Sequence, residues 1–244
     1  MRDELKPSEN LQEKFCSPMP LIGDKAPAFI AETTKGEIHF PDDYEGKWTI
    51  LFSHPADFTP VCTSELYTFA KLTQEFKELN TELIGLSVDS VSSHLAWLKS
   101  IEEEIKFKSD QNVKIEYPVI ADVKMAVAKK YGMIHPSASD TKAVRAVFFI
   151  DPEAKIRAIL YYPLSTGRNF QELKRLLIAL QMTDKHKVST PADWQPGDDV
   201  VVSAPTTLKD LENEKNKRDG CDCSTWYFCT KKIPGTENIT NRVN

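Results

Sequence analysis

The sequence predicts an α/β fold followed by a smaller C-terminal domain. Short apolar runs that suit buried strands alternate with segments whose apolar residues recur at helical spacing, a pattern typical of a sheet covered by helices. Near residue 186 the composition shifts to proline-rich and then cysteine-rich sequence. The length of 244 residues also fits one to two domains. We expect an N-terminal arm over 1–20, a main domain over 21–185 and a C-terminal domain over 186–244.

The first half of the main domain is expected to contain two strands and two helices. The run Trp-Thr-Ile-Leu-Phe at 48–52 suits a strand buried on both faces, and a second apolar run covers 83–88. Apolar residues over 66–79 recur at helical spacing, and those over 95–105 do the same. A strand-helix-strand-helix order follows, which favours an α/β domain whose strands are buried on both faces.

The second half of the main domain repeats these patterns. A helix is expected over 123–131, with Gly132 placed to end it. Two strands are expected over 143–150 and 156–162, where apolar and β-branched residues are concentrated. A last helix is expected over 170–180, because its leucines recur three or four residues apart.

The C-terminal domain is expected to be mostly extended. Pro191, Pro196 and Pro205 interrupt regular structure there. A short strand is expected at 200–202, and a charged helix at 208–217. The remaining tail is rich in cysteine and aromatic residues, so we expect it to form a partner surface.

Composition and charge exclude several classes of protein. A net charge of −5 disfavours nucleic acid as a partner, because phosphate binding needs lysine and arginine clustered on one face. No segment approaches the roughly 18 apolar residues of a membrane span, so no membrane partner is expected. Five cysteines are too few for a secreted disulfide scaffold of this length. We therefore expect a cytoplasmic protein whose cysteines are reactive or bind metal.

The segment His-Pro-Ala-Asp-Phe-Thr-Pro-Val-Cys-Thr-Ser-Glu at 54–65 places Cys62 where the first strand passes into the first helix. Thr59 suits the N-cap of that helix, and Pro60 suits its first position, where a missing N–H costs nothing. Cys62 then lies in the first turn, where free N–H groups and the positive helix end favour a thiolate nucleophile. Pro55 and Pro60 donate no backbone hydrogen bond and can wall a pocket against water. A buried structural cysteine is the alternative from these residues alone.

The spacing Pro55-x-x-x-Thr59-x-x-Cys62 matches the signature of a known family. Through it the chain resembles the peroxiredoxins, thiol peroxidases with a thioredoxin-like fold. The His54-Pro55 pair and the long C-terminal domain resemble the peroxiredoxin 6-like subfamily, and the tail cysteines resemble its archaeal-type members. The resemblance covers about 21–230, with further similar segments in the family's order at 85–90, 144–151, 165–170 and 191–197.

The resemblance implies a role for each of several residues. Cys62 corresponds to the peroxidatic cysteine, and Pro55 shapes its pocket. Thr59 and Arg145 correspond to the residues that bind the peroxide and stabilise the breaking O–O bond. His54 and Arg168 are further candidates for substrate binding, with a helix-start salt bridge as the alternative for Arg168. Glu65 is a candidate for the surroundings of the site.

The cysteines of the tail decide how oxidised Cys62 is recycled. By position, Cys229 resembles the resolving cysteine and Cys223 an accessory thiol, which implies a disulfide from Cys62 of one subunit to Cys229 of another. Cys221 has no assigned role. Zinc binding by the three tail thiols is the alternative, but no fourth ligand lies at a spacing typical of zinc sites, so we expect no metal. Cys16, in the N-terminal arm, is expected to be a surface or packing thiol.

The function predicted from these observations is reduction of hydrogen peroxide and organic hydroperoxides, with a thioredoxin-type or other thiol reductant as partner. No phosphate-binding glycine loop occurs, so no cofactor is expected. By resemblance the protein is a homo-oligomer, with a ring of dimers favoured. The alternative function is that of a chaperone or peroxide sensor, which need not turn over quickly.

Overall fold

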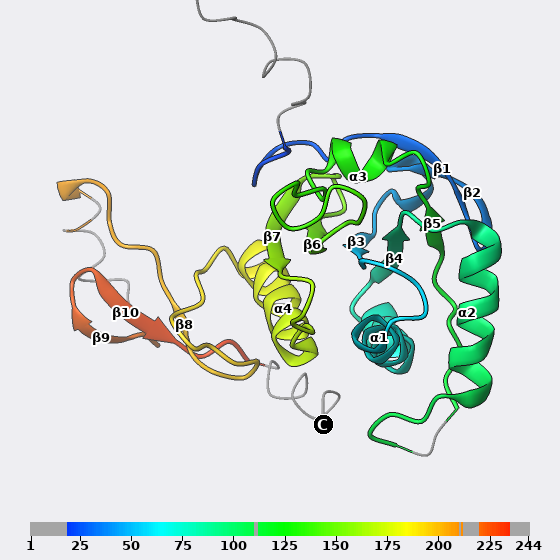
Figure 1. Cartoon of the computed structure of the whole chain (residues 1–244). Helices are drawn as coiled ribbons and strands as arrows, with labels where there is room; N and C mark the ends of the chain where they lie inside the picture. Colours follow the sequence, from blue (N-terminus) through cyan, green and yellow to red (C-terminus); the bar gives the residue numbers. More distant parts are fainter. Residues whose placement is uncertain (1–18, 110–111, 210, 212–219, 235–244) are drawn as a thin grey trace, which may run out of the picture. The chain divides into compact units, whose positions relative to one another are not determined.

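The computed structural model describes residues 19–109, 112–209, 211 and 220–234 (Figure 1). The chain forms two compact units, one of Met1–Thr73 and Asn80–Gly167, the other of Gln74–Leu79 and Arg168–Asn244. The units divide between Gly167 and Arg168, before the helix that ends at His186, whereas the boundary predicted after residue 185 lies at the end of that helix. Cys16 and most of the predicted helix over 208–217 lie outside the described residues.

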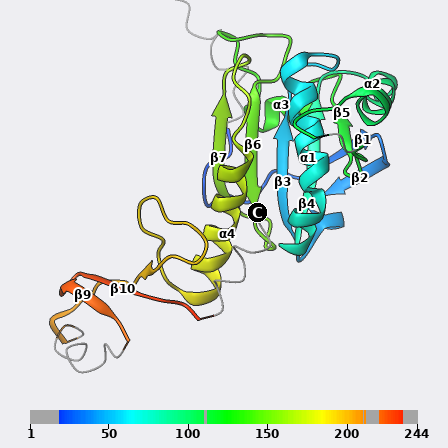
Figure 2. The same cartoon turned by 90° about the horizontal axis from the view of Figure 1, so that it is seen from below.

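The first unit is built on one mixed sheet of seven strands, in the order β2-β1-β5-β4-β3-β6-β7. The fold class predicted from the sequence is confirmed. In the centre, β3 pairs in parallel with β4 and antiparallel with β6 (Figure 2). The strands are β1 Phe29–Thr33, β2 Gly36–Phe40, β3 Trp48–Ser53, β4 Thr81–Ser87, β5 Val119–Ala121, β6 Arg145–Ile150 and β7 Ile156–Tyr162.

The helices begin where capping groups are available. Ser90 accepts a hydrogen bond from the Ser93 N–H at the start of one helix, and Asn169 accepts two at the start of another. The helices are α1 Pro60–Glu78, α2 Val91–Glu104, α3 Ala126–Lys130 and α4 Phe170–His186, with a short 3₁₀ helix, η1, at Asp42–Tyr44.

The predicted helix over 123–131 is wrong at its start. Helix α3 begins only at Ala126, because Met125 before it has left-handed backbone geometry with φ of 55°. The carboxylate of Asp122 accepts hydrogen bonds from the N–H groups of Ala126 and Ala128, at 2.8 and 2.6 Å. The chain therefore turns through 122–125 before the helix can form.

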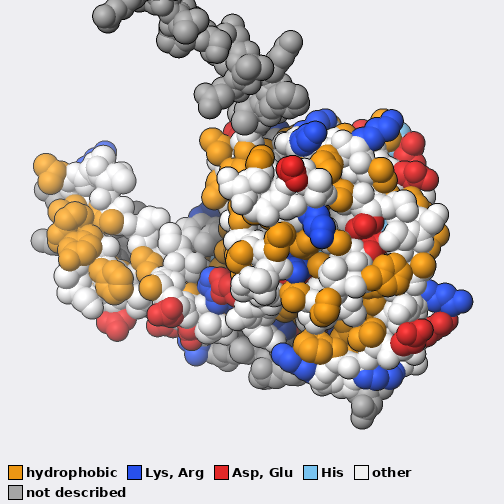
Figure 3. Space-filling view, in the orientation of Figure 1, with side chains coloured by type: hydrophobic (Ala, Val, Ile, Leu, Met, Phe, Trp, Pro, Cys, Tyr) orange, Lys and Arg blue, Asp and Glu red, His pale blue; other side chains and the backbone are white. Residues whose placement is uncertain are grey.

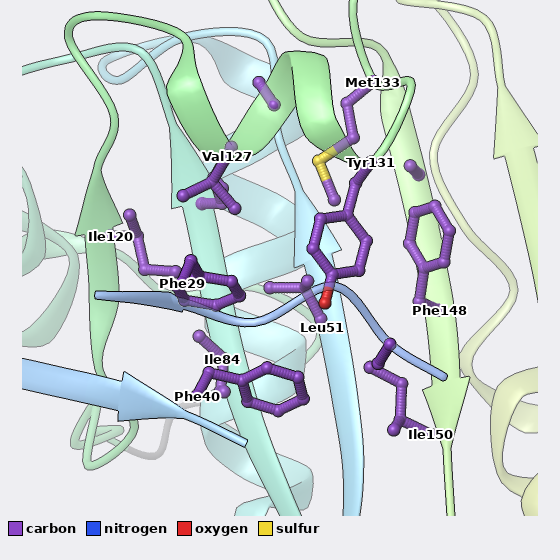
Figure 4. Close-up of a cluster of buried hydrophobic side chains, with 14 of the residues drawn as sticks. Phe29, Phe40, Leu51, Ile84, Ile120, Val127, Tyr131, Met133, Phe148 and Ile150 are labelled. Atoms are coloured by element: carbon purple, nitrogen blue, oxygen red, sulfur yellow. The ribbon is translucent and has the colours of Figure 1, made fainter. Parts of the chain in front are cut away.

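The two faces of the sheet bury different side chains. Successive residues of a strand point to opposite faces. On one face, Leu51 of β3 packs in a cluster with Val127 of α3, and Figure 4 shows the aromatic rings that share this cluster. On the other face, the ring of Phe52 stacks on Phe69 of α1, with centroids 3.9 Å apart. Helices α1 and α3 thus cover opposite faces of β3.

Ser53, the last residue of β3, fixes the pairing of this strand with β6. Its hydroxyl donates to the carbonyl of Val144 at 2.6 Å and accepts from the N–H of Ala146 at 3.1 Å. Both partners are neighbours of Arg145 in the sequence. Because Ser53 also begins the connection to α1, one side chain ties the start of the Cys62 segment to the strand that carries Arg145.

The second unit contains α4 and a small three-stranded sheet, ordered β8-β10-β9. Strand β8 covers Val200–Val201, as predicted, while β9 at Asp222–Thr225 and β10 at Phe228–Lys231 form a hairpin in the tail that was expected only to be extended. Trp194 is the largest side chain of this unit's apolar cluster. Within the described residues of the whole chain, no helix combines the length and apolarity needed to cross a bilayer.

Candidate active site

The segment between β3 and α1 forms a tight connection that carries the predicted motif. Pro55 is buried, as expected for a pocket wall, and Phe58 has left-handed geometry with φ of 54°. Helix α1 begins at Pro60, and the N–H of Thr63 donates to the carbonyl of Thr59 at 2.9 Å. The Thr59 hydroxyl donates to the carbonyl of Ala56 at 2.9 Å, so it points back along the connection.

Cys62 lies in the first turn of α1, at the place that the sequence predicted. It is a free thiol with 0% of its surface exposed. Nη1 of Arg145 donates to its sulfur at 3.4 Å. A guanidinium next to sulfur favours the negatively charged thiolate, the nucleophilic form. This contact joins residues 83 positions apart in the sequence.

Arg145 is held rigidly at this position by its other hydrogen bonds. Nη1 also donates to Oε2 of Glu65 at 2.6 Å, and this ion pair is almost completely buried. Nε and Nη2 both donate to the carbonyl of Leu164, at 3.2 and 2.8 Å. Glu65, one turn along α1 from Cys62, therefore orients the arginine. A fixed guanidinium can donate to an oxygen bound beside the sulfur without first reorganising.

His54 lies beside Asp57, and its recorded hydrogen bond is to that residue and not to Cys62. Its Nε2 is 2.9 Å from Oδ1 of Asp57, so Nε2 carries the proton, and both side chains are buried. Burial lowers the pKa of His54, against the opposing effect of Asp57. Its Nδ1 has no hydrogen-bond partner among the residues that the structure describes. His54 is therefore a neutral ring, and its predicted role in substrate binding stays a prediction.

The lowered pKa of His54 predicts a pH dependence of stability. Because the folded state resists protonation of this ring, the unfolded chain binds the proton first as pH falls below about 6.5. The free energy of unfolding should decrease between pH 7 and 5, and part of that decrease should be missing in His54→Gln. Urea unfolding of both proteins at several pH values measures the difference. Equal slopes in the two proteins would contradict it.

Arg168 is buried and lies at the start of the second unit, one residue before the N-cap of α4. Cys62, Arg145 and Glu65 belong to the first unit. The proposed part of Arg168 in substrate binding therefore stays a prediction.

The tail contains a disulfide between Cys223 and Cys229, which lie on the paired strands β9 and β10. Cys223 is exposed, whereas only 2% of the surface of Cys229 is exposed. The aromatic tip between them, Trp226, Tyr227 and Phe228, is also exposed, and Figure 3 shows hydrophobic side chains gathered on this part of the surface. Cys221 is a half-buried free thiol.

Sequence reasoning missed a buried polar cluster beside the motif. Asp57 contacts Ser93 and His94 of α2 as well as His54. Asp57 and His94 are 37 residues apart, and no local pattern joins them. The usable signal is the position of His94 on the same helical face as Trp97 and Ile101, both buried, because a histidine there needs polar partners inside the fold.

Comparisons with known proteins agree with this geometry. The AhpC/TSA family profile matches residues 22–159, and the profile of the C-terminal domain of 1-Cys peroxiredoxin matches 179–217. A peroxiredoxin of Methanosarcina mazei is 62% identical over 215 residues, covering 88% of this chain and 98% of its own. One of Aquifex aeolicus is 50% identical over 225 residues, with the same coverage.

Solved structures give the same result. The yeast mitochondrial 1-Cys peroxiredoxin superimposes with a TM-score of 0.77 at 43% identity, covering 88% of this chain and all of its own. Peroxiredoxin 6 of Arenicola marina superimposes with a TM-score of 0.76 at 34% identity, covering 88% and 99% of the two chains.

Proposed function

The chain belongs to the AhpC/TSA family and is a peroxiredoxin, a peroxidase that uses thiol electrons, and from this premise we propose that Cys62 reduces hydrogen peroxide and small organic hydroperoxides. The observation that carries the proposal is the contact between Nη1 of Arg145 and the buried sulfur of Cys62. The Cys62 thiolate attacks one peroxide oxygen, and the O–O bond breaks. The sulfur becomes a sulfenic acid, and the other oxygen leaves as water or an alcohol after taking a proton.

Ionising the thiol is too small an effect to account for catalysis. An ordinary thiol is a few per cent ionised at pH 7, so complete ionisation gains only about 30-fold, or about 2 kcal/mol. Enzymes commonly lower barriers by about 8 kcal/mol or more. The larger share must come from donors that stabilise the separating oxygens. We assign this work to Arg145, the Thr59 hydroxyl and the backbone N–H groups near Cys62, with Pro55 walling the pocket.

We further propose that the tail recycles Cys62 through two successive disulfides. The thiol of Cys229 from a neighbouring subunit attacks the sulfenic acid, which forms the Cys62–Cys229 bond and releases water. The Cys223 thiolate of the same tail then attacks the sulfur of Cys229. Cys62 leaves as a thiolate, and the Cys223–Cys229 disulfide remains. A thioredoxin-type dithiol supplies the two electrons that reopen this disulfide.

Two observations support this use of the tail. Cys223 and Cys229 are close enough to be bonded across the β9–β10 hairpin, so an exchange between them needs little movement within the tail. Cys223 is exposed, whereas Cys229 is buried, which favours attack by an external thiol on the sulfur of Cys223. The similar yeast protein is named for a thiol resolving mechanism via glutathione/thioredoxin systems, and we propose the same classes of reductant here.

Non-reducing gels and intact masses after one equivalent of peroxide test the proposed recycling. The chain first needs full reduction, because a bonded Cys229 cannot attack Cys62. In Cys223→Ser, the second exchange is blocked, so a covalent dimer linked from Cys62 to Cys229 should accumulate. In the wild type, that dimer should be transient and give way to monomers that contain the tail disulfide. The covalent dimer would also show that two subunits meet, as the proposed homo-oligomer, a ring of dimers, requires.

The matched controls are Cys229→Ser and Cys221→Ser. The first should remove the dimer, and the second should leave it unchanged. A dimer that survives in Cys229→Ser but disappears in Cys221→Ser would show that Cys221, and not Cys229, is the resolving thiol. If no variant forms a dimer and turnover depends only on added thiol, the protein uses one cysteine and an external reductant, as the name of the matched C-terminal domain suggests.

A further inference from the structure

A buried carboxylate–imidazole pair joins the connection between β3 and α1 to helix α2 and has no part in the reaction described above. The carboxylate of Asp57 faces Nδ1 of His94, with distances of 2.8 and 3.0 Å from its two oxygens. Ser93 donates its hydroxyl to the same carboxylate at 2.7 Å. The side chains of Asp57 and His94 are 2% and 0% exposed. The connection between β3 and α1 is thus joined to helix α2 through buried groups that water does not reach.

The geometry fixes the protonation of His94. Its Nδ1 faces a carboxylate, and its Nε2 faces the carbonyl of Ile120 at 3.2 Å. Both partners only accept hydrogen bonds, so both ring nitrogens must donate, and the ring is an imidazolium. Burial alone would raise the pKa of Asp57, but hydrogen bonds from His54 and His94 hold it well below its ordinary value. The buried charges therefore balance.

This pair is tied to the motif by a short length of chain. Asp57 lies two residues before Thr59 and five before Cys62. Its N–H also donates to the carboxylate of Asp89 at 3.0 Å. The connection is thus held by its backbone to the turn between β4 and α2, and by the Asp57 side chain to α2 itself.

We propose that His94, as a buried imidazolium paired with Asp57, is a positioning residue that holds this connection and the first turn of α1 in the conformation that reacts with peroxide. It contacts neither the peroxide nor Cys62, and acts through Asp57. Resolution, the attack of a second thiol on oxidised Cys62, needs a conformation in which Cys62 lies outside its pocket. Disulfide geometry requires Cα atoms about 4.4 to 6.8 Å apart, so a buried Cys62 must leave its pocket to meet another thiol. Weakening the pair should therefore slow oxidation and favour resolution.

A metal ion is the competing interpretation of the same side chains. One ligand atom each from His54, Asp57 and His94 lie within 4.8 Å of one another. The ion pair explains more of the contacts, because it accounts for two ring donors on one carboxylate and leaves no net charge buried. A divalent cation with one carboxylate would leave a buried positive charge.

The test is His94→Gln, measured in two separate steps by stopped-flow fluorescence and mass spectrometry. Glutamine keeps a neutral donor but cannot bring a positive charge to Asp57. The rate constant for oxidation of Cys62 should fall by roughly ten- to a hundredfold, because small misplacements of reacting groups have effects of that size. The rate of disulfide formation should not fall, and less Cys62 should be over-oxidised to sulfinic acid at high peroxide. A variant that is merely less stable would not slow oxidation while leaving the rate of disulfide formation undiminished.

Two further variants distinguish the loss of the pair from poor folding of His94→Gln. His39→Gln, an exposed histidine of β2, should leave both steps unchanged. Asp57→Asn/His94→Gln replaces the ion pair by a neutral pair of amides and should recover part of the oxidation rate lost in Asp57→Asn. An unchanged oxidation rate in folded His94→Gln, or an equal fall in both steps, would overturn the proposal.

Metal analysis of the purified wild type decides the remaining alternative. Less than stoichiometric zinc, iron and copper is expected. One equivalent of a metal that is lost in His94→Gln would replace the ion pair by a metal site. The inference rests on the proposed reaction of Cys62. A wild type without peroxidase activity in the same assay would point to failure of that function, whereas an active wild type with an unaffected variant would point to failure of this inference alone.

Discussion

Replacing Cys62 by serine should abolish peroxide consumption, with a loss on the order of 10⁴-fold or more, as expected when a nucleophile is removed. The substitution deletes the sulfur that attacks the peroxide while changing little volume in a completely buried position. The fold should therefore remain. Steady-state consumption of hydrogen peroxide with a dithiol reductant measures the loss, and circular dichroism with urea unfolding checks the fold.

The matched control is a double variant, Cys223→Ser/Cys229→Ser, which keeps Cys62 but has no tail dithiol. It should complete one rapid oxidation of Cys62 and then depend on added thiol for further turnover. If Cys62→Ser retained substantial turnover, the whole assignment of the active site would be wrong. If the double variant lost the first oxidation as well, the tail would be needed for the reaction with peroxide itself.

Arg145→Lys should lower the second-order rate constant for oxidation of Cys62 by about a hundred- to a thousandfold, the effect of losing one preorganised donor to a developing oxyanion. Lysine keeps a positive charge for Glu65 but lacks the planar fork that reaches Glu65, Cys62 and the carbonyl of Leu164 together. Stopped-flow oxidation measures the rate at a pH where ultraviolet absorbance shows that the thiol is fully ionised. If the loss disappeared there, Arg145 would only promote ionisation.

A matched variant separates this effect from instability. Arg145→Met alone would remove the guanidinium that pairs with the buried carboxylate of Glu65, and breaking a buried ion pair in this way typically costs about 3 to 5 kcal/mol. Arg145→Met/Glu65→Gln removes both charges and should fold better than Arg145→Met. It should nevertheless react with peroxide at least as slowly as Arg145→Lys. Recovery of the rate in the double variant would mean that the arginine only neutralises Glu65.

Strands β3 and β6 were predicted from sequence because each is one long buried run. All six residues of β3 and all six of β6 are buried, so their composition is apolar throughout. Strands β1 and β2 are partly exposed and carry polar residues, and β5 has three residues, too few for a periodic pattern. Their pairing depends on contacts that are distant in sequence. The β9–β10 hairpin was missed for a related reason, because its strands are mostly exposed and offer no apolar alternation.

The active-site motif could be predicted because its chemistry is encoded locally. A cysteine in the first turn of a helix has a physical meaning before any fold is known. The position of Arg145 next to it depended on resemblance, and the structure supplies the reason, since β6 runs antiparallel beside β3. The pairing of Asp57 with His94 matched no motif, and the buried face of α2 could point only to His94, because the pair exists only once α2 has packed beside the connection.

Cys62, Arg145 and Glu65 lie in the first unit, while both cysteines of the tail disulfide lie in the second. Under the proposed recycling, oxidation and repair are therefore separate tasks on one chain. When reductant runs short and the tail stays oxidised, the reduced thiol of Cys62 would still meet peroxide. Each further encounter moves its sulfur toward sulfinic acid, which thiols do not reverse. A population of these molecules would then keep a cumulative record of exposure, in which the fraction of inactivated chains counts the peroxide that arrived after the supply of electrons had ended.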